Sequence, residues 1–250
     1  MADGLVMSLA QAGVIELLAP TPPGWGANLL RGFLVSIKIG AGAFVLGLVF
    51  GIGGACGKLY GSVAVRELLL GYTTLIRAVP ELILILLIYF AVPDLLNRLL
   101  ISFGYGPVEL GGLAAGIIAL GFVKGAYATE VLRAAILAVP QGQIEAARAF
   151  GMSPSTMLRR ITLPAMLPHA IPGLANLWLI AVKNTALLAV VGFSELTLET
   201  RQAAGATKAY FTFFMAAGIL YLLFALVSNV VIGRIETWAR RGQPSTAGGQ

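Results

Sequence analysis

The segment GFLVSIKIGAGAFVLGLVFGIGGACG, residues 32–57, is apolar apart from Ser36 and Lys38. About 20 apolar helical residues cross a hydrocarbon core of about 30 Å, so this segment predicts a transmembrane helix. Its glycines recur at helical spacing, which lets a neighbouring helix approach closely. The run Gly51-Ile-Gly53-Gly54 does not indicate nucleotide binding, because no strand precedes it and no acidic partner follows.

The composition of the whole chain places much of it in lipid. Of 250 residues, 58% are hydrophobic and only 11% are charged, whereas a soluble domain carries about 25% charged residues. The net charge of +6 does not indicate nucleic acid as a partner, because no polar region is present to carry such a site. Excess Lys and Arg in a membrane protein usually records topology. Cys56 is the only cysteine, which excludes a disulfide framework and a thiolate metal site.

Further apolar stretches predict an all-α integral membrane protein with about five transmembrane helices. The expected spans are Gly32 to Gly57, Val65 to Val92, Gly111 to Val139, Ile171 to Gly192 and Phe211 to Ile235. Pro93 is predicted to close the second span and Pro140 the third.

The chain is expected to hold one membrane domain, residues 28–238. Residues 1–27 form an N-terminal segment, periplasmic or interfacial, with a weakly amphipathic helix over 5–18 and no removable signal peptide. Residues 239–250 form a disordered cytoplasmic tail, rich in Gly and Ser. With the N-terminus outside and the C-terminus inside, more basic residues fall on the inner side, among them Lys58, Arg133 and Arg148. This bias favours that orientation.

The polar segment between the third and fourth spans, residues 140–170, has the pattern of a helix-turn-helix. Residues Gln143 to Phe150 are predicted to be helical, and Gly151 allows a left-handed turn. Ser153-Pro154 then restarts a helix with an N-cap and a proline at its first position. We predict that this loop lies on the cytoplasmic face and transmits force from a soluble partner.

The loop is similar to a known motif. Its spaced residues resemble the EAA loop of ABC importer permeases: Glu145, Ala146, Ala147, Gly151, Ile161, Leu163 and Pro164. Gly71 to Glu81, Gly125 to Arg133 and Leu163 to Leu188 resemble the polar amino-acid uptake permeases. The chain is most similar to the first membrane subunit of the histidine/lysine/arginine/ornithine importers and their opine-importing relatives.

This resemblance covers roughly residues 28–238 and implies a bacterial inner-membrane permease subunit that imports amino acids, cationic ones or opines. It implies two partner ATPase subunits, a second permease subunit (a sister chain favoured over a second copy, with both left open), and a periplasmic solute-binding protein. The ATPase would take the loop around Glu145 and Gly151 in a groove beside its nucleotide site.

The chain itself has no Gly-x4-Gly-Lys-Ser/Thr phosphate loop, so we expect a transport subunit without enzymatic activity, with ATP bound by its partner and no cofactor or metal of its own. The alternative is a secondary transporter or channel that needs no ATPase. That alternative predicts inverted internal repeats, which are not apparent, and leaves the spaced loop motif unexplained.

Ionisable residues inside spans are costly and indicate either pairs or a solute pathway. Arg77 and Glu81 lie one helical turn apart around Pro80, and are either a self-neutralising pair or a solvated site. Glu130, near Tyr127, either pairs with Arg133 or receives a cationic side chain. Lys38 and Lys124 are expected to snorkel to the interface.

The consecutive polar residues Lys183, Asn184 and Thr185 in the fourth span favour a substrate pathway over helix-helix hydrogen bonding. Many related permeases carry Asp and then Thr after the lysine, so Asn184 departs from their pattern. Glu195 and Glu199 are expected to be solvated loop charges or contacts for the binding protein.

Overall fold

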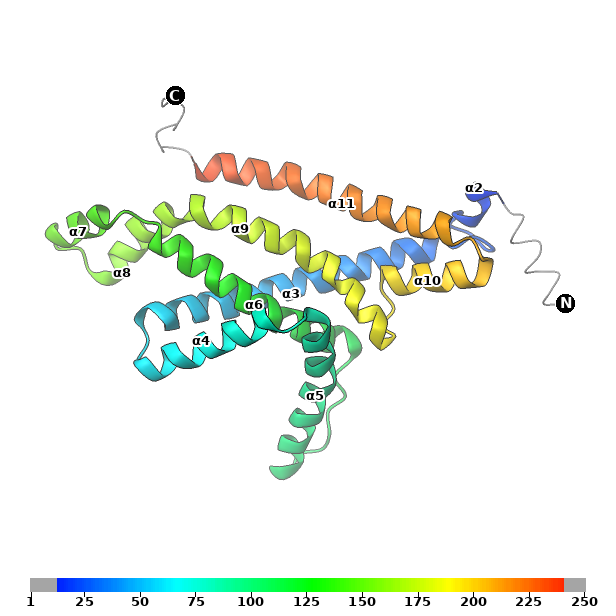
Figure 1. The fold of residues 1–250 in the computed structure, drawn as a ribbon, viewed down its shortest axis with the longest axis horizontal. Coiled ribbons are helices and arrows are strands. Elements are labelled where there is room, and N and C mark those ends of the chain that lie inside the picture. Colours follow the sequence, from blue (N-terminus) through cyan, green and yellow to red (C-terminus); the bar gives the residue numbers. More distant parts are fainter. Residues whose placement is uncertain (1–12, 241–250) are drawn as a thin grey trace.

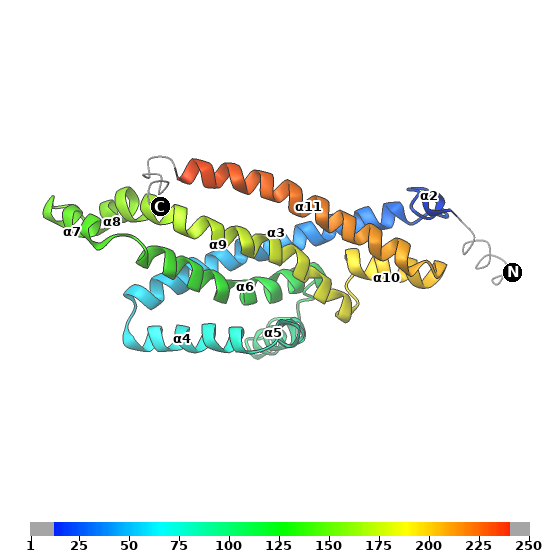
Figure 2. The ribbon, with the colours of Figure 1, turned by 45° about the horizontal axis from the view of Figure 1, so that its top comes forward.

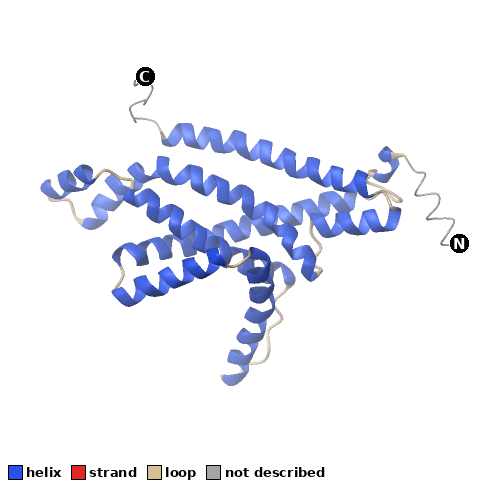
Figure 3. Cartoon of the chain, in the orientation of Figure 1, coloured by secondary structure: helices blue, strands red, loops and turns tan. Residues whose placement is uncertain are grey.

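The computed structural model describes residues 13–240, and every regular element in that range is a helix (Figure 3). Five helical runs there are long and apolar enough to cross a membrane, which confirms the predicted architecture. They are α3 (Gly26–Tyr60), α5 (Glu81–Ser102), α6 (Gly112–Leu137), the run Pro154–Val191 that contains α9 (Leu163–Asn184), and α11 (Tyr210–Ala239). Most of the predicted helix 5–18 and of the predicted tail 239–250 falls outside the described residues.

Helices α3 and α6 form the most extensive helix pair of the described chain (Figures 1 and 2). The glycines of α3 make this contact close. A Cβ atom at Gly51 would lie 2.5 Å from Cβ of Ala128, and one at Gly47 would lie 3.0 Å from Cβ of Lys124. The glycine spacing of residues 32–57 therefore serves helix packing, as predicted.

The predicted second span, Val65 to Val92, is wrong because two helices occupy this stretch. Helix α4 (Val63–Ala78) ends at Ala78, and the next residue, Val79, has extended dihedrals, φ −95° and ψ 140°. A residue before proline is pushed out of the helical region, so Pro80 enforces the break. Helix α5 then leaves in a new direction (Figure 1). It continues through Pro93 to Ser102, because membrane helices tolerate an internal proline.

The two ends of the bundle carry different short elements. At one end lie α7 (Gln141–Ala149) and α8 (Pro154–Met157), near the last turn of α11 (Figure 1). At the other end lie α2 (Val14–Leu17) and α10 (Leu196–Thr207). Helix α10 occupies the stretch after Glu195 that was predicted to be a loop.

Glu195, predicted to be a solvated loop charge, is fully buried at the start of α10. One carboxylate oxygen caps the helix by accepting the N–H of Leu198 at 3.0 Å, and the other accepts the hydroxyl of Ser36 at 3.1 Å. Burial raises the pKa of this carboxyl. The sequence interpretation failed here because a polar N-cap and a loop charge look alike without their surroundings.

Candidate functional site

The segment between α6 and α9 folds as the predicted helix-turn-helix. Helix α7 ends at Ala149, and Gly151 adopts a left-handed conformation with φ 68°. The Ser153 hydroxyl accepts the N–H of Thr156 at 3.3 Å, and Pro154 takes the first position of α8. A π-helical turn, Leu158–Thr162, then leads into α9.

The residues of the predicted coupling motif divide into a buried anchor and an exposed surface. Ala147 is only 3% exposed, and Ile144 packs against the cluster that holds Val139 and Met166. Ile161 is half-buried, while the remaining motif residues are exposed: Glu145, Ala146, Gly151, Leu163 and Pro164. The loop is therefore anchored on α6 and α9 while one side stays open to a partner.

A buried charge cluster lies where α5 begins, and we call it the Glu81 cluster: Glu81, Lys124, Tyr127 and Asn184. Lys124 Nζ lies 3.1 Å from both carboxylate oxygens of Glu81, and the amide nitrogen of Asn184 also donates to Oε2 of Glu81. Lys124 Nζ lies 5.4 Å from the ring centroid of Tyr127. The Lys124 side chain is 2% exposed and that of Glu81 25%. The carboxylate is thus the accessible member of the pair.

The local fold explains this pair. Glu81 is the first residue of α5, where the positive end of the helix dipole favours a carboxylate. Lys124 lies in the middle of α6 under α3, so its ammonium cannot reach the membrane interface. The snorkelling prediction for Lys124 is therefore wrong. For Lys38, which is exposed, it stays a prediction.

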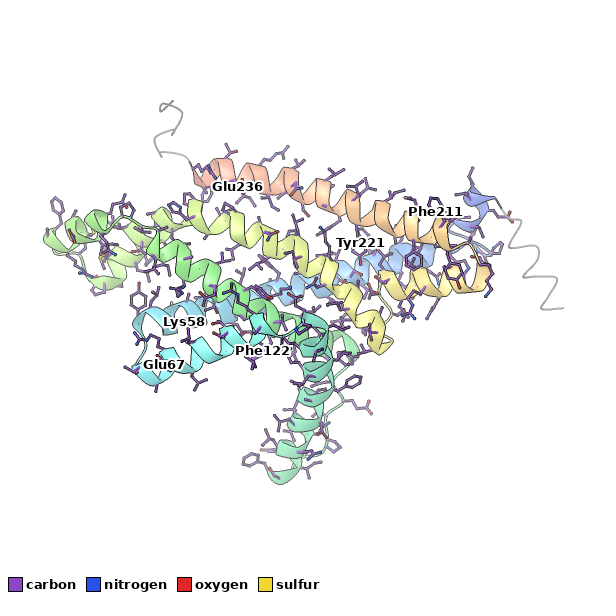
Figure 4. The ribbon with its side chains drawn as sticks, viewed as in Figure 1. Lys58, Glu67, Phe122, Phe211, Tyr221 and Glu236 are labelled. Carbon is purple, nitrogen blue, oxygen red and sulfur yellow. The ribbon has the colours of Figure 1, made fainter. Side chains whose placement is uncertain are left out.

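A second cluster, the Glu130 cluster, consists of Lys58, Thr73, Glu130 and Arg133. Lys58 Nζ donates to Oε1 of Glu130 at 2.6 Å and to the Thr73 hydroxyl at 2.5 Å. Arg133 Nη2 donates to Oε2 of Glu130 at 3.0 Å, which confirms the predicted pairing of Glu130 with Arg133. Lys58, at the end of α3 (Figure 4), has a side chain that is only 5% exposed.

Arg77 belongs beside the second cluster rather than with Glu81. It lines a pocket of about 390 Å³ together with Lys58, Leu70, Thr73, Thr74, Ala78 and Glu130. The proposed one-turn pair of Arg77 and Glu81 is therefore wrong. The helical spacing that would join them is interrupted by the extended Val79.

The three consecutive polar residues of the fourth span, Lys183, Asn184 and Thr185, do not contribute to one site. Asn184 joins Glu81, whereas Lys183 is exposed and Thr185 is buried with its hydroxyl bonded to the carbonyl of Val182 at 2.7 Å. Successive helical residues point about 100° apart, so three in a row cannot share one face.

Sequence reasoning missed Lys58, Thr73 and Lys124 as site residues. The signal for Lys124 was present, because a lysine between the glycines of Gly121-Phe-Val-Lys-Gly125 lies at a close helix contact. Within residues 13–240, no group of three or more His, Cys, Asp or Glu side chains is placed to hold a metal ion.

These features define a class of protein. The five spans and the helix-turn-helix belong to a chain whose residues 43–241 match the family of binding-protein-dependent transport system inner membrane components. The chain belongs to this family. It is a multi-pass inner-membrane transport component, not an enzyme, and the family implies ATPase and binding-protein partners.

Individual relatives agree. The chain is 42% identical over 230 residues to the nopaline transport system permease protein NocQ of Agrobacterium fabrum, covering 91% of this chain and 98% of the relative. It is 40% identical over 213 residues to the histidine/lysine/arginine/ornithine transport system permease protein HisQ of Escherichia coli, covering 85% and 93%. A crystal structure of an amino acid ABC transporter with histidines superposes with a TM-score of 0.73 at 27% identity, covering 86% and 95%.

Proposed function

We propose that this chain is a permease subunit of an ATP-driven importer for cationic amino acids or opines. The named solutes of its relatives support that cargo class. The structural observation that supports this cargo class is the Glu81 cluster, in which the lysine is inaccessible to solvent and the carboxylate is partly exposed. A solute that arrives there meets the carboxylate rather than the lysine. Among residues 13–240, Oε1 of Glu81 accepts only from Lys124, so it can accept a further hydrogen bond from an ammonium or guanidinium.

The other residues of the predicted substrate pathway are proposed from their positions relative to the two clusters. Tyr127 and Asn184 border the accessible carboxylate, and Arg77 and Glu130 lie at the second cluster. The exposed Lys183 is free to face a second permease subunit, whereas the buried Thr185 stabilises its own helix.

The helix-turn-helix is the proposed contact for the ATPase. Its exposed residues, with Phe150 at 84% exposure, offer a surface to a soluble partner. Ile144 ties that surface to the ends of α6 and α9, so a displacement of the loop moves those helices as rigid bodies. Two ATPase subunits and a sister permease would complete the machine.

We place the end with α7 and α8 in the cytoplasm. Arg148, Arg159 and Arg160 are exposed there, which agrees with the bias of basic residues toward the inner side. Helix α2 lies at the opposite end from the last turn of α11 (Figure 1), which supports the proposal that the N-terminus is outside and the C-terminus inside.

The test is uptake of radiolabelled arginine and histidine by proteoliposomes that hold this chain with its sister permease, ATPase and binding protein. Gly151→Asp forces a side chain into φ 68° at the turn, a strain of about 1–3 kcal/mol. ATP-driven uptake is expected to fall about tenfold or more, because the loop no longer presents its surface.

Gly142→Asp is the matched control. Gly142 lies in the first turn of α7, and an added Cβ there meets nothing within 4 Å, so uptake should persist. Uptake without ATP or ATPase would contradict the importer and support a secondary transporter or channel. ATP hydrolysis with no arginine or histidine uptake would keep the machine and overturn the cargo.

A further inference from the structure

The pocket beside the Glu130 cluster has the size and lining of a ligand site. Its volume of about 390 Å³ falls within the range of about 300–1,000 Å³ seen for ligand pockets. Most of its lining is polar or charged: Lys58, Thr73, Thr74, Arg77 and Glu130. The pocket shares no residue with the coupling loop or with the Glu81 cluster.

The charges around this pocket do not balance. Both oxygens of Glu130 are occupied, one by Lys58 and the other by Arg133. Within the described part of the chain, no carboxylate lies within 4.0 Å of the Arg77 guanidinium. One acid therefore stands against three cations. Such an excess of positive charge in a hollow attracts an anion.

Free donors are available in the same place. An ammonium carries three N–H donors, and Lys58 directs two of them at Thr73 and Glu130, which leaves one. The guanidinium of Arg77 is a planar fork that matches a carboxylate with two parallel hydrogen bonds. Thr74, which carries a hydroxyl, lines the same pocket.

We propose that this pocket binds the α-carboxylate of the amino-acid cargo, as a second station after the Glu81 cluster. This rests on the proposed function, because it assumes an amino-acid cargo. Helix α4, which supplies Thr73, Thr74 and Arg77, runs from the Pro80 break toward the end of the bundle that carries α7 and α8 (Figure 1). The cationic end of the cargo is held first, by an acid, and the carboxylate is held next, by Arg77 and Lys58.

The experiment compares arginine with agmatine, which is arginine without its carboxylate. The complete permease–ATPase complex is placed in nanodiscs of phosphatidylcholine, and binding of both radiolabelled probes is measured by equilibrium dialysis. We expect arginine to bind about tenfold tighter than agmatine, since a bidentate charged pair adds that much. Arg77→Gln should bring the ratio near one by weakening arginine alone, and Arg77→Lys should give an intermediate ratio.

Arg66→Gln is the matched control, because Arg66 is an exposed basic residue on the same helix, outside the pocket. Its ratio should equal that of the unaltered complex. Thr74→Val is a milder probe that should lower the ratio even if Arg77→Gln assembles poorly. An equal loss of arginine and agmatine binding in both pocket variants would overturn the proposal.

A lipid phosphate is the other source of an anion. If phosphatidylglycerol copurifies with the unaltered complex but not with Arg77→Gln, and the arginine-to-agmatine ratio is already near one, the cargo station is overturned. If the unaltered complex neither binds nor transports arginine, the cargo assignment fails together with the station. If it transports arginine but Arg77→Gln keeps the ratio, the station alone fails.

Discussion

Each of the two charge clusters holds a sealed lysine against a partly exposed carboxylate, but the clusters differ in the further cations around that pair. In the Glu81 cluster the lysine is sealed at 2% exposure and the carboxylate is 25% exposed. In the Glu130 cluster the lysine is 5% exposed and the carboxylate 20%, and a second cation, Arg133, also bonds the carboxylate. Arg77, which has no carboxylate within 4.0 Å among residues 13–240, lines the pocket beside it. The Glu81 cluster therefore sets one carboxylate against one ammonium, whereas the surroundings of Glu130 set one carboxylate against three cations.

The break at Pro80 produces this difference. It places Arg77 on α4, beside the end of α3, and Glu81 on α5, against the middle of α6. A continuous helix would have let these two residues neutralise each other. The interruption leaves each charge to a different neighbour, and this separation is the basis of the two stations proposed for the cargo.

The largest loss of stability is expected when the Glu81 cluster is broken. Lys124→Met leaves Glu81 without its cation, which for a buried pair costs about 3–5 kcal/mol. We expect the lower end of that range, because water reaches part of Glu81. Lys58→Met should cost only about 1 kcal/mol, because Glu130 keeps Arg133 and Thr73 keeps the carbonyl of Leu70. Unfolding of the purified complex in mixed micelles measures both.

The control for this prediction is the double variant Glu81→Gln with Lys124→Met. Removing the charge of Glu81 should recover a large part of the stability that Lys124→Met loses. If the double variant is no more stable than Lys124→Met, the loss comes from packing under α3 and not from the unpaired carboxylate.

A smaller loss of stability is expected from substitution of a glycine of α3 that lies near the Glu130 cluster. A Cβ atom at Gly54 would lie 2.8 Å from Cγ2 of Thr129, next to Glu130. Gly54→Ala should therefore push α3 away from α6 and weaken the bond between Lys58 and Glu130, at a cost of about 1–3 kcal/mol. Gly53→Ala is the control, since nothing lies within 4 Å of the added atom, and it should be neutral or slightly stabilising.

Double variants test whether the two clusters are separate. Gly54→Ala and Lys58→Met act on one contact, so their effects on stability should not add. Gly54→Ala and Lys124→Met act on different clusters and should add within about 0.5 kcal/mol. Strong coupling in the second pair would show that the clusters form one network.

The sequence was sufficient for the number of spans and for the turn of the coupling loop, because both depend on local rules. Apolar length predicts a span, and Gly151 followed by Ser153-Pro154 predicts a turn and a new helix start. The break at Pro80 was missed because Val65 to Val92 is apolar enough on average to hide a change of direction. The preference of Val79 for extended backbone was the available signal.

The charge partners were harder to predict because they depend on which helices meet. Glu130 and Arg133 are neighbours on one helix, so their pair was predictable. The pairs of Glu81 with Lys124 and of Lys58 with Glu130 join residues far apart in the chain. Their partners follow only from the close packing of α3 on α6 and from the new direction of α5.

The smallest expected effect concerns Tyr127, whose ring centroid lies 5.4 Å from Lys124 Nζ. Tyr127→Phe keeps this cation–π contact, whereas Tyr127→Leu removes it, so the leucine variant should be less stable by about 1 kcal/mol. Unfolding of the two variants gives this difference directly. In a Lys124→Met background the difference should vanish, because no cation remains. A difference that persists there would mean that the ring stabilises the Glu81 cluster by packing alone, and that Glu81 suffices to hold the buried lysine.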